Sequence, residues 1–256
     1  MGHIRLGRLP KTQSWRAVAR LLRGGADEEE IFIASSRAIE RSLTVASNDP
    51  VFVEAVRLLC LIPQAGRSRE FGVRLRELGI EVPDSPGLAQ LLTATGRHLD
   101  RSAGITGRSD FGELARRALV GTLASEIGGT LPSLFGTTPS EVRISTARLS
   151  NDRSFSEAAR AFFGRLMSDT LSSWLDRTLS AQVGNGLRFD DGADRAAFDV
   201  ALRQHCIEAT RIIREFAAGW YGKTIFRDGT VTPQRAAGFA AVAVSKIGRE
   251  LRARET

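Results

Sequence analysis

The sequence contains few of the residues that build covalent or metal-based sites. Among 256 residues there are two cysteines and three histidines, and the motifs GxSxG, HExxH and CxxC are absent. Cys60 and Cys206 both lie within apolar helical patterns, where a cysteine is typically a small buried hydrophobic residue. We therefore expect no disulfide, no metal site, no cofactor and no recognisable catalytic set.

Long hydrophobic runs are also missing. A membrane-spanning helix needs about 18 or more apolar residues, and the nearest run, AAGFAAVAV at 236–244, is much shorter. The N-terminal sequence MGHIRLGRLP lacks the apolar core of a secretory signal. These features predict a chain without a membrane span and with a cytoplasmic location.

Alternating strand patterns of any length are absent, whereas signals for helix starts are frequent. Thr138-Pro-Ser-Glu141 is a capping box with proline at the first helical position. Asp49-Pro50, Ser85-Pro86 and Thr232-Pro233 each pair a capping residue with proline. The signals predict helices at roughly the following positions: 12–23, 27–46, 50–62, 68–78, 86–103, 110–127, 139–148, 154–181, 194–221 and 233–252.

We therefore predict an all-α, bundle-like array of nine or ten helices with a basic N-terminal arm. Apolar residues recur every three to four positions from Phe198 to Trp220, which is typical of one side of a long helix. Residues 1–25 would form the arm and first helix, and residues 26–256 the helical body. The body is divided in this hypothesis into subdomains 26–130 and 131–256, with the glycine-rich loop 184–192 as a candidate mobile segment.

The net charge of +7 is concentrated at the N-terminus. Residues 1–25 hold six basic side chains and no acidic one, whereas the other 231 residues carry 30 basic and 29 acidic side chains. Such an arm suits a phosphate backbone, an anionic membrane or an acidic partner. The predicted binding residues are Arg5, Arg8, Lys11, Arg16, Arg20 and Arg23.

The segment EFAAGWYGKTIF, residues 215–226, ends like a nucleotide-binding P-loop at Gly222-Lys223-Thr224. The first glycine of the motif GxxxxGK[ST] is missing, because position 217 is alanine, and a long helix rather than a strand precedes it. Gly222 is instead predicted to stop that helix, with Trp220 as its last core residue and Tyr221 at the rim. The alternative is an exposed docking patch of Trp220, Tyr221 and Lys223 for a partner protein.

Residues 68–98 are compatible with a helix-turn-helix. The second helix would present Gln90, Thr93, Thr95, Arg97 and His98 to a DNA major groove. The intervening segment is longer than the usual turn and contains Pro83, which favours an ordinary helical hairpin.

Three functional hypotheses follow. The first is a non-enzymatic accessory or adaptor subunit of a bacterial multiprotein complex, which docks partner proteins and binds nucleic acid or an acidic partner through its arm. Antiviral (phage) defence is a hypothesis about its setting. The second is a DNA-binding transcriptional regulator that uses residues 68–98. The third is an enzyme with dispersed residues such as His205, Glu208 and Asp191. The oligomeric state stays open.

Overall fold

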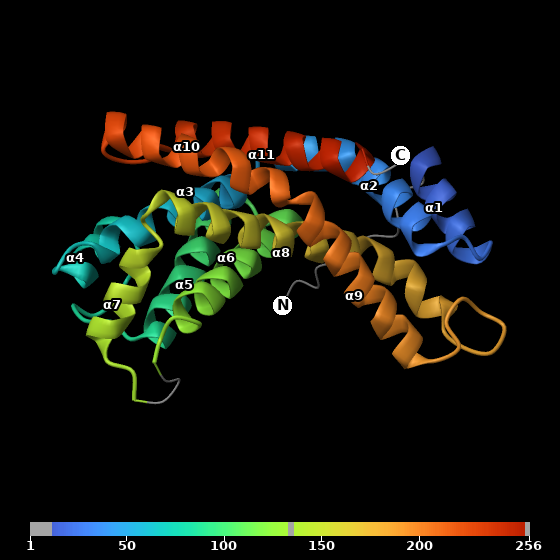
Figure 1. The fold of residues 1–256 in the computed structure, drawn as a ribbon, viewed down its shortest axis with the longest axis horizontal. Coiled ribbons are helices and arrows are strands. Elements are labelled where there is room, and N and C mark those ends of the chain that lie inside the picture. The colour runs from blue at the N-terminus through green and yellow to red at the C-terminus, as the bar shows by residue number, and fades with distance from the viewer. Residues whose placement is uncertain (1–11, 133–135, 254–256) are drawn as a thin grey trace.

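The computed structural model describes residues 12–132 and 136–253 and is all-helical there, as predicted (Figure 1). Its only β-type pairing in those ranges is an isolated bridge between Val183 and Phe189. The α-helices are α1 (Gln13–Arg23), α2 (Glu28–Ala46), α3 (Pro50–Gly66), α4 (Phe71–Glu77), α5 (Leu88–Thr106), α6 (Asp110–Gly128), α7 (Pro139–Arg148), α8 (Asp152–Leu179), α9 (Gly192–Ala209), α10 (Arg211–Asp228) and α11 (Pro233–Ala253).

The N-terminal caps explain where many of these helices begin. Thr138 and Glu141 form the predicted capping box at α7, and Asp49 accepts a hydrogen bond from the Phe52 amide at α3. At α8 the cap is Asn151, three residues before the predicted start, because its side chain accepts from the Ser154 amide. No helix within the described ranges is long and apolar enough to cross a membrane.

The long helix predicted at 194–221 is two helices, α9 and α10, which meet at Thr210. Thr210 is fully buried, and its hydroxyl donates to the Ile207 carbonyl at 2.8 Å. This local bond competes with the regular helical pattern, as threonine side chains often do. The chain turns here without glycine or proline, so α10 runs along α11 while α9 extends away from it (Figure 1).

The predicted stop at Gly222 is wrong. Helix α10 continues to Asp228 and ends at Gly229, which adopts the left-handed conformation with φ 67°. Gly222 lies inside the helix, where a Cβ atom would stand 2.7 Å from Oδ2 of Asp152 at the start of α8. Its missing side chain therefore permits a close helix crossing.

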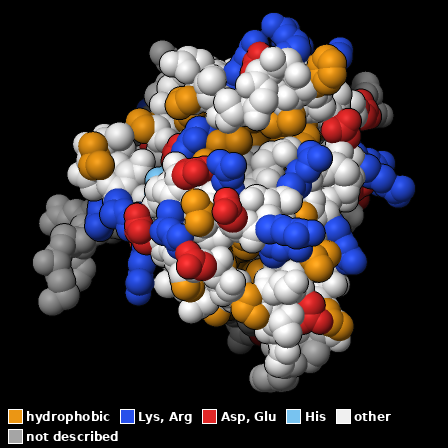
Figure 2. All heavy atoms as spheres, turned by 90° about the vertical axis from the view of Figure 1, so that its left-hand side faces the viewer, with side chains coloured by type: hydrophobic (Ala, Val, Ile, Leu, Met, Phe, Trp, Pro, Cys, Tyr) orange, Lys and Arg blue, Asp and Glu red, His pale blue; other side chains and the backbone are white. Residues whose placement is uncertain are grey.

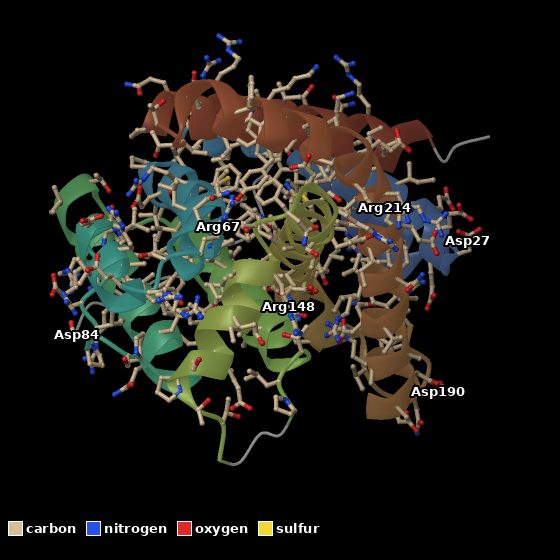
Figure 3. The ribbon with its side chains drawn as sticks, turned by 60° about the vertical axis from the view of Figure 1, so that its left-hand side comes forward. Asp27, Arg67, Asp84, Arg148, Asp190 and Arg214 are labelled. Atoms are coloured by element: carbon tan, nitrogen blue, oxygen red, sulfur yellow. The ribbon has the colours of Figure 1, made fainter. Side chains whose placement is uncertain are left out.

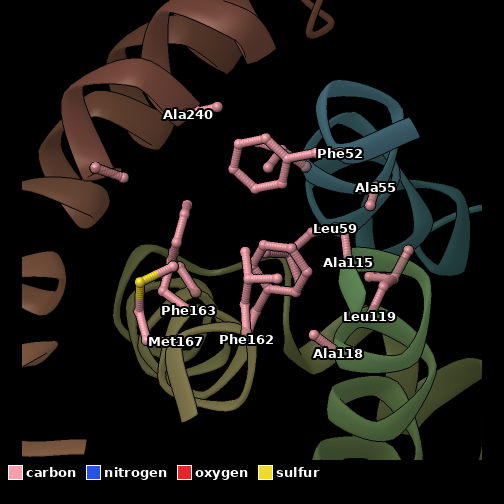
Figure 4. Packing of buried hydrophobic residues seen from close by; sticks show 14 of the residues in the cluster. Phe52, Ala55, Leu59, Ala115, Ala118, Leu119, Phe162, Phe163, Met167 and Ala240 are labelled. Carbon is pink, nitrogen blue, oxygen red and sulfur yellow. The ribbon is translucent and has the colours of Figure 1, made fainter. Parts of the chain in front are cut away.

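Helix α8 forms the centre of the hydrophobic core (Figure 4). Phe162, Phe163 and Met167 are completely buried on it. Phe52 of α3 packs against both phenylalanines, with ring centroids 6.3 Å and 6.2 Å away. Small residues of α6 and α11, including Ala115 and Ala240, let these helices approach the aromatic cluster.

One buried cluster runs through both halves of the chain and includes α1. Trp15, Val18 and Leu22 of α1 belong to the same cluster as residues of α11. The loop predicted as a candidate mobile segment contributes Phe189, which is 4% exposed, and Arg188, which donates to the Ala26 carbonyl. The division of the body into two subdomains stays a prediction.

The surface charge is mixed at the end of the molecule where α3, α7 and α10 terminate. Figure 2 shows Lys and Arg side chains spread over this end and interleaved with acidic and hydrophobic ones. This pattern agrees with the nearly neutral composition of residues 26–256.

Tyr221 connects α10 to α3 and α8. Its hydroxyl accepts a hydrogen bond from Gln64 Nε2 at 2.6 Å and donates one to the Cys60 carbonyl at 3.2 Å. Its ring stacks on Phe155, with centroids 3.9 Å apart. Burial raises the pKa of the phenol above its ordinary value, so the neutral, donating form is present at neutral pH.

We expect Tyr221→Phe to destabilise the protein by about 1–3 kcal/mol, because it leaves Gln64 and the Cys60 carbonyl without this buried partner. The free energy of unfolding in urea measures the effect. Lys223→Ala, on the exposed side of the same helix, should change it by less than about 0.5 kcal/mol. Equal effects of the two substitutions would contradict this role of Tyr221.

We expect two glycine-to-alanine substitutions to change the stability of the protein in opposite directions. A Cβ at Gly66 would lie 2.7 Å from the backbone nitrogen of Ala147, so alanine should destabilise the α3–α7 contact by about 1–3 kcal/mol. Gly219 is exposed in α10 and a Cβ there would meet no atom within 4 Å, so alanine should stabilise the protein by up to about 1 kcal/mol. Thermal unfolding of both variants measures the difference, and a stabilised Gly66→Ala would disprove the close approach.

Candidate functional site

The first candidate surface is the basic face of α1. The helix begins at the cap Thr12 and buries one side on the body, where Trp15 stacks on Trp174 of α8 with centroids 5.4 Å apart. Arg16, Arg20 and Arg23 lie on its exposed side. Arg5, Arg8 and Lys11 lie outside the described residues. The part of the predicted binding set within the described residues is therefore a fixed helical face.

The surroundings of this face limit its extent. Arg23 donates from Nε to the Ala19 carbonyl at 3.0 Å, and basic residues in the last turn of a helix also complement its dipole. The first turn of α2 carries the exposed Glu28, Glu29 and Glu30. The positive surface of α1 is thus bounded at its C-terminal end by acidic side chains.

The predicted docking patch does not form one surface. Tyr221 is 1% exposed and belongs to the core, whereas Trp220 is half-buried and stacks on Phe239 at 4.2 Å between centroids. The sequence-based assignment of Trp220 to the core and Tyr221 to the rim is therefore reversed. Of the three predicted residues, only Lys223 is fully exposed, and Phe226 beyond it is 91% exposed.

Residues 68–98 form α4, a long connection and the first part of α5. Thr95 is buried and donates to the Leu91 carbonyl, while Gln90 accepts a hydrogen bond from the Gly87 amide at the start of α5. His98 bonds to the Gly79 carbonyl and to Glu54. Thr93 and Arg97 are exposed. Three of the five side chains predicted to read DNA are thus engaged within the protein.

Glu54 anchors this segment to α3. It accepts hydrogen bonds from Arg57 at 2.7 Å and 2.8 Å and lies 2.8 Å from Nε2 of His98. Burial by itself would raise the pKa of the carboxyl, but the hydrogen bonds and charges of Arg57 and His98 outweigh it and hold the pKa below its usual value.

Of the residues of the dispersed-enzyme hypothesis, His205 and Glu208 lie one turn apart near the end of α9, and Asp191 lies at its start. His205 is 7% exposed beside the Phe32 ring, and Glu208 accepts a hydrogen bond from Gln204. Asp191 caps the opposite end of α9 through the amides of Ala193 and Asp194. Within the described ranges, no three His, Cys, Asp or Glu side chains are grouped to hold a metal ion.

The two cysteines are free and buried, as predicted. Burial raises the pKa of the Cys60 thiol well above its ordinary value and that of Cys206 to about 12. Both side chains are therefore neutral thiols at physiological pH, which disfavours nucleophilic or redox chemistry.

A groove between α6, α8 and α9 has no signal in the sequence alone. Its volume is about 680 Å³. Its charged lining residues come from three helices, namely Arg117, Glu126, Glu157, Arg160, Arg165, Asp169 and Arg203. Taken singly, each of these residues is ordinary for an exposed helix face. Only the packing of the three helices brings them together.

Comparison of the chain with protein-family models, with curated proteins and with solved structures finds no match.

We expect Glu54→Gln to lower the free energy of unfolding by about 1–3 kcal/mol at neutral pH, because Arg57 and His98 lose a charged acceptor. The pKa of Glu54 is depressed in the folded state, so its contribution is present above the unfolded pKa and is lost as the pH falls through the folded one. The difference in free energy of unfolding between wild type and variant should therefore decrease as the pH falls from about 7 to about 3. Urea unfolding across this range measures it.

The matched control for this prediction is Glu77→Gln. Glu77 pairs with Arg74 on the exposed surface of α4, where an ion pair contributes about 0–1 kcal/mol. A difference for Glu54→Gln that stays constant with pH would mean that the charge of Glu54 is not the stabilising feature.

Proposed function

We propose that the protein is a non-enzymatic helical accessory subunit that binds nucleic acid or an acidic protein partner through the arginine face of α1. The observation that carries this proposal is the two-sided character of that helix. Trp15, Val18 and Leu22 hold one side in the core, and Arg16, Arg20 and Arg23 remain exposed on the other. A charged face on an immobilised helix loses little conformational entropy on binding.

The distribution of charge supports the same proposal. The arginines of α1 continue the acid-free stretch that begins at the N-terminus of the chain, whereas the rest of the sequence is nearly neutral. Local positive charge of this kind raises the rate of encounter with polyanions without requiring a deep pocket. The arrangement of His205, Glu208 and Asp191 gives no comparable support to an enzymatic function.

The experiment is a binding titration of the full chain against three fluorescent probes: a DNA duplex, a single-stranded RNA and a polyglutamate peptide. A triple variant replaces Arg16, Arg20 and Arg23 by alanine. For nucleic acid we expect this variant to bind more weakly and to reduce the slope of log affinity against log salt by about two to three. If the partner is an acidic protein, we expect the triple variant to lose affinity for the polyglutamate peptide instead.

The matched control replaces Arg148, Arg211 and Arg227 by alanine, which removes the same charge from exposed positions on other helices. Binding by the α1 face requires the control to retain most of the wild-type affinity. Equal losses of affinity in both triple variants would mean that binding depends on net charge and not on the α1 face, which contradicts the proposal. An absence of binding to all three probes at low salt would also refute it.

A further inference from the structure

The groove between α6, α8 and α9 is polar and open, and small residues on its floor give it depth. Ala118, Ala161 and Gly164 line it between the charged side chains. A Cβ at Gly164 would make only ordinary contacts, the nearest at 3.4 Å from the Thr210 hydroxyl, so the missing side chain leaves space beside the junction of α9 and α10. Its volume of about 680 Å³ is within the range of about 300–1,000 Å³ that is typical of small-molecule sites.

The arginines of the groove have spare hydrogen-bonding capacity. Four arginines line it: Arg117, Arg160, Arg165 and Arg203. Among them, Arg117 donates one hydrogen bond to Glu113, Arg160 one to the Ile207 carbonyl and Arg165 one to the Ser125 hydroxyl. Arg203 makes no hydrogen bond or close ion pair within the described residues. Four guanidinium groups carry about twenty N–H donors in all, so most of them are available to a ligand.

The lining of the groove carries more positive than negative charge. Each of the three helices contributes an arginine to it, namely Arg117 from α6, Arg165 from α8 and Arg203 from α9. All three interact electrostatically with Asp169. Glu113 pairs with both Arg116 and Arg117, and Arg116 also pairs with Asp100. In the lining itself the four arginines outnumber the three carboxylates, Glu126, Glu157 and Asp169. Burial outweighs the three arginines and raises the pKa of Asp169 above its ordinary value.

Glu126 and Glu157 add hydrogen-bond acceptors to the lining. Glu157 pairs with Arg214 at 3.2 Å, and Figure 3 shows Arg214 near the upper end of α9. Glu126 has no close ion pair within the described residues; burial raises the pKa of its carboxyl, although Arg165 interacts with it electrostatically. The Nε of Arg160, one turn from Glu157 on α8, is buried without an acceptor in the described structure. The carboxylates are thus interleaved with arginines, which suits a short ligand that carries both an anionic group and hydrogen-bond donors.

We propose that this groove binds a phosphorylated small molecule, with its phosphate at Arg117, Arg165 and Arg203 and its hydroxyl or amino groups toward Glu126 and Glu157. Arginine matches phosphate geometry through paired N–H donors, and the charge of about −2 on a phosphate monoester suits three guanidinium groups better than a single carboxylate does. The carboxylates of the lining accept hydrogen bonds from donors on the ligand. The site is separate from the α1 face, and its test does not depend on that proposal.

The test follows the backbone amide signals of Gly164 and Arg203 in the ¹⁵N-labelled full chain during titration. The probes are inorganic phosphate, ribose 5-phosphate and ribose. We expect both phosphates to shift these signals, ribose 5-phosphate to bind more tightly than phosphate, and ribose to have no effect. Arg203→Ala should weaken the binding of ribose 5-phosphate about tenfold or more, because it removes a charged donor that has no structural bond to replace.

Two further variants control the result. Arg227→Ala removes an exposed arginine of α10 and should leave the affinity unchanged. Asp169→Asn removes the competing carboxylate and should tighten binding several-fold. The proposal fails if neither phosphate shifts the signals, if ribose binds as well as ribose 5-phosphate, or if Arg203→Ala has no effect. It also fails if an oligonucleotide occupies the groove more tightly than ribose 5-phosphate, since the groove would then belong to a nucleic-acid surface.

Discussion

The hydrogen bonds of the Tyr221 hydroxyl are the constraint on which the arrangement of the C-terminal half depends. A buried phenol needs partners for its polar end, and these are Gln64 and Cys60 of α3, more than 150 residues earlier in the chain. Because the ring also stacks on Phe155, α10 has one position against both α3 and α8. Helix α10 begins directly after the junction at Thr210, where α9 ends, and α9 forms one wall of the groove.

Small residues determine how closely the helices can approach one another in this arrangement. Gly222 lets α10 cross the start of α8 beside Asp152, and Gly66 lets α3 meet the backbone of α7. Where Gly164 occurs in α8, the same lack of a side chain contributes to a cavity instead of a tight contact. Gly222 and Gly164 lie inside helices, where glycine is unfavourable by about 1 kcal/mol relative to alanine, and Gly66 is the last residue of α3. Packing geometry therefore accounts for them better than helix propensity does.

Local features of the sequence were sufficient to predict the helices but not the surfaces. The capping box at Thr138 and the cap at Asp49 act within a few residues, so their effect can be read from the chain alone. The break at Thr210 accompanies a local hydroxyl bond that the apolar spacing does not reveal, and Gly222, the expected stop, lies instead at a crossing with the distant α8. Tyr221 and His98 could not be placed from the sequence either, because their hydrogen-bond partners lie in another helix. Tyr221 bonds to Gln64 and Cys60 of α3, and His98 bonds to Glu54 of α3. The groove was missed because its arginines are spread over positions 117–203 and converge only through packing.

Helix α8 gives both proposed surfaces a common support. Trp174 holds α1 against the body, and Asp169 and Arg165 lie only one to three turns away on the same helix. Helix α8 is continuous, and Phe162, Phe163 and Met167 pack its buried side into the core. It therefore holds Trp174, Asp169 and Arg165 at fixed distances from one another. A tightly packed helix of this kind resists continuous deformation. The two surfaces are therefore best understood as separate charged regions supported by one rigid helix, each defined by arginines on its exposed side.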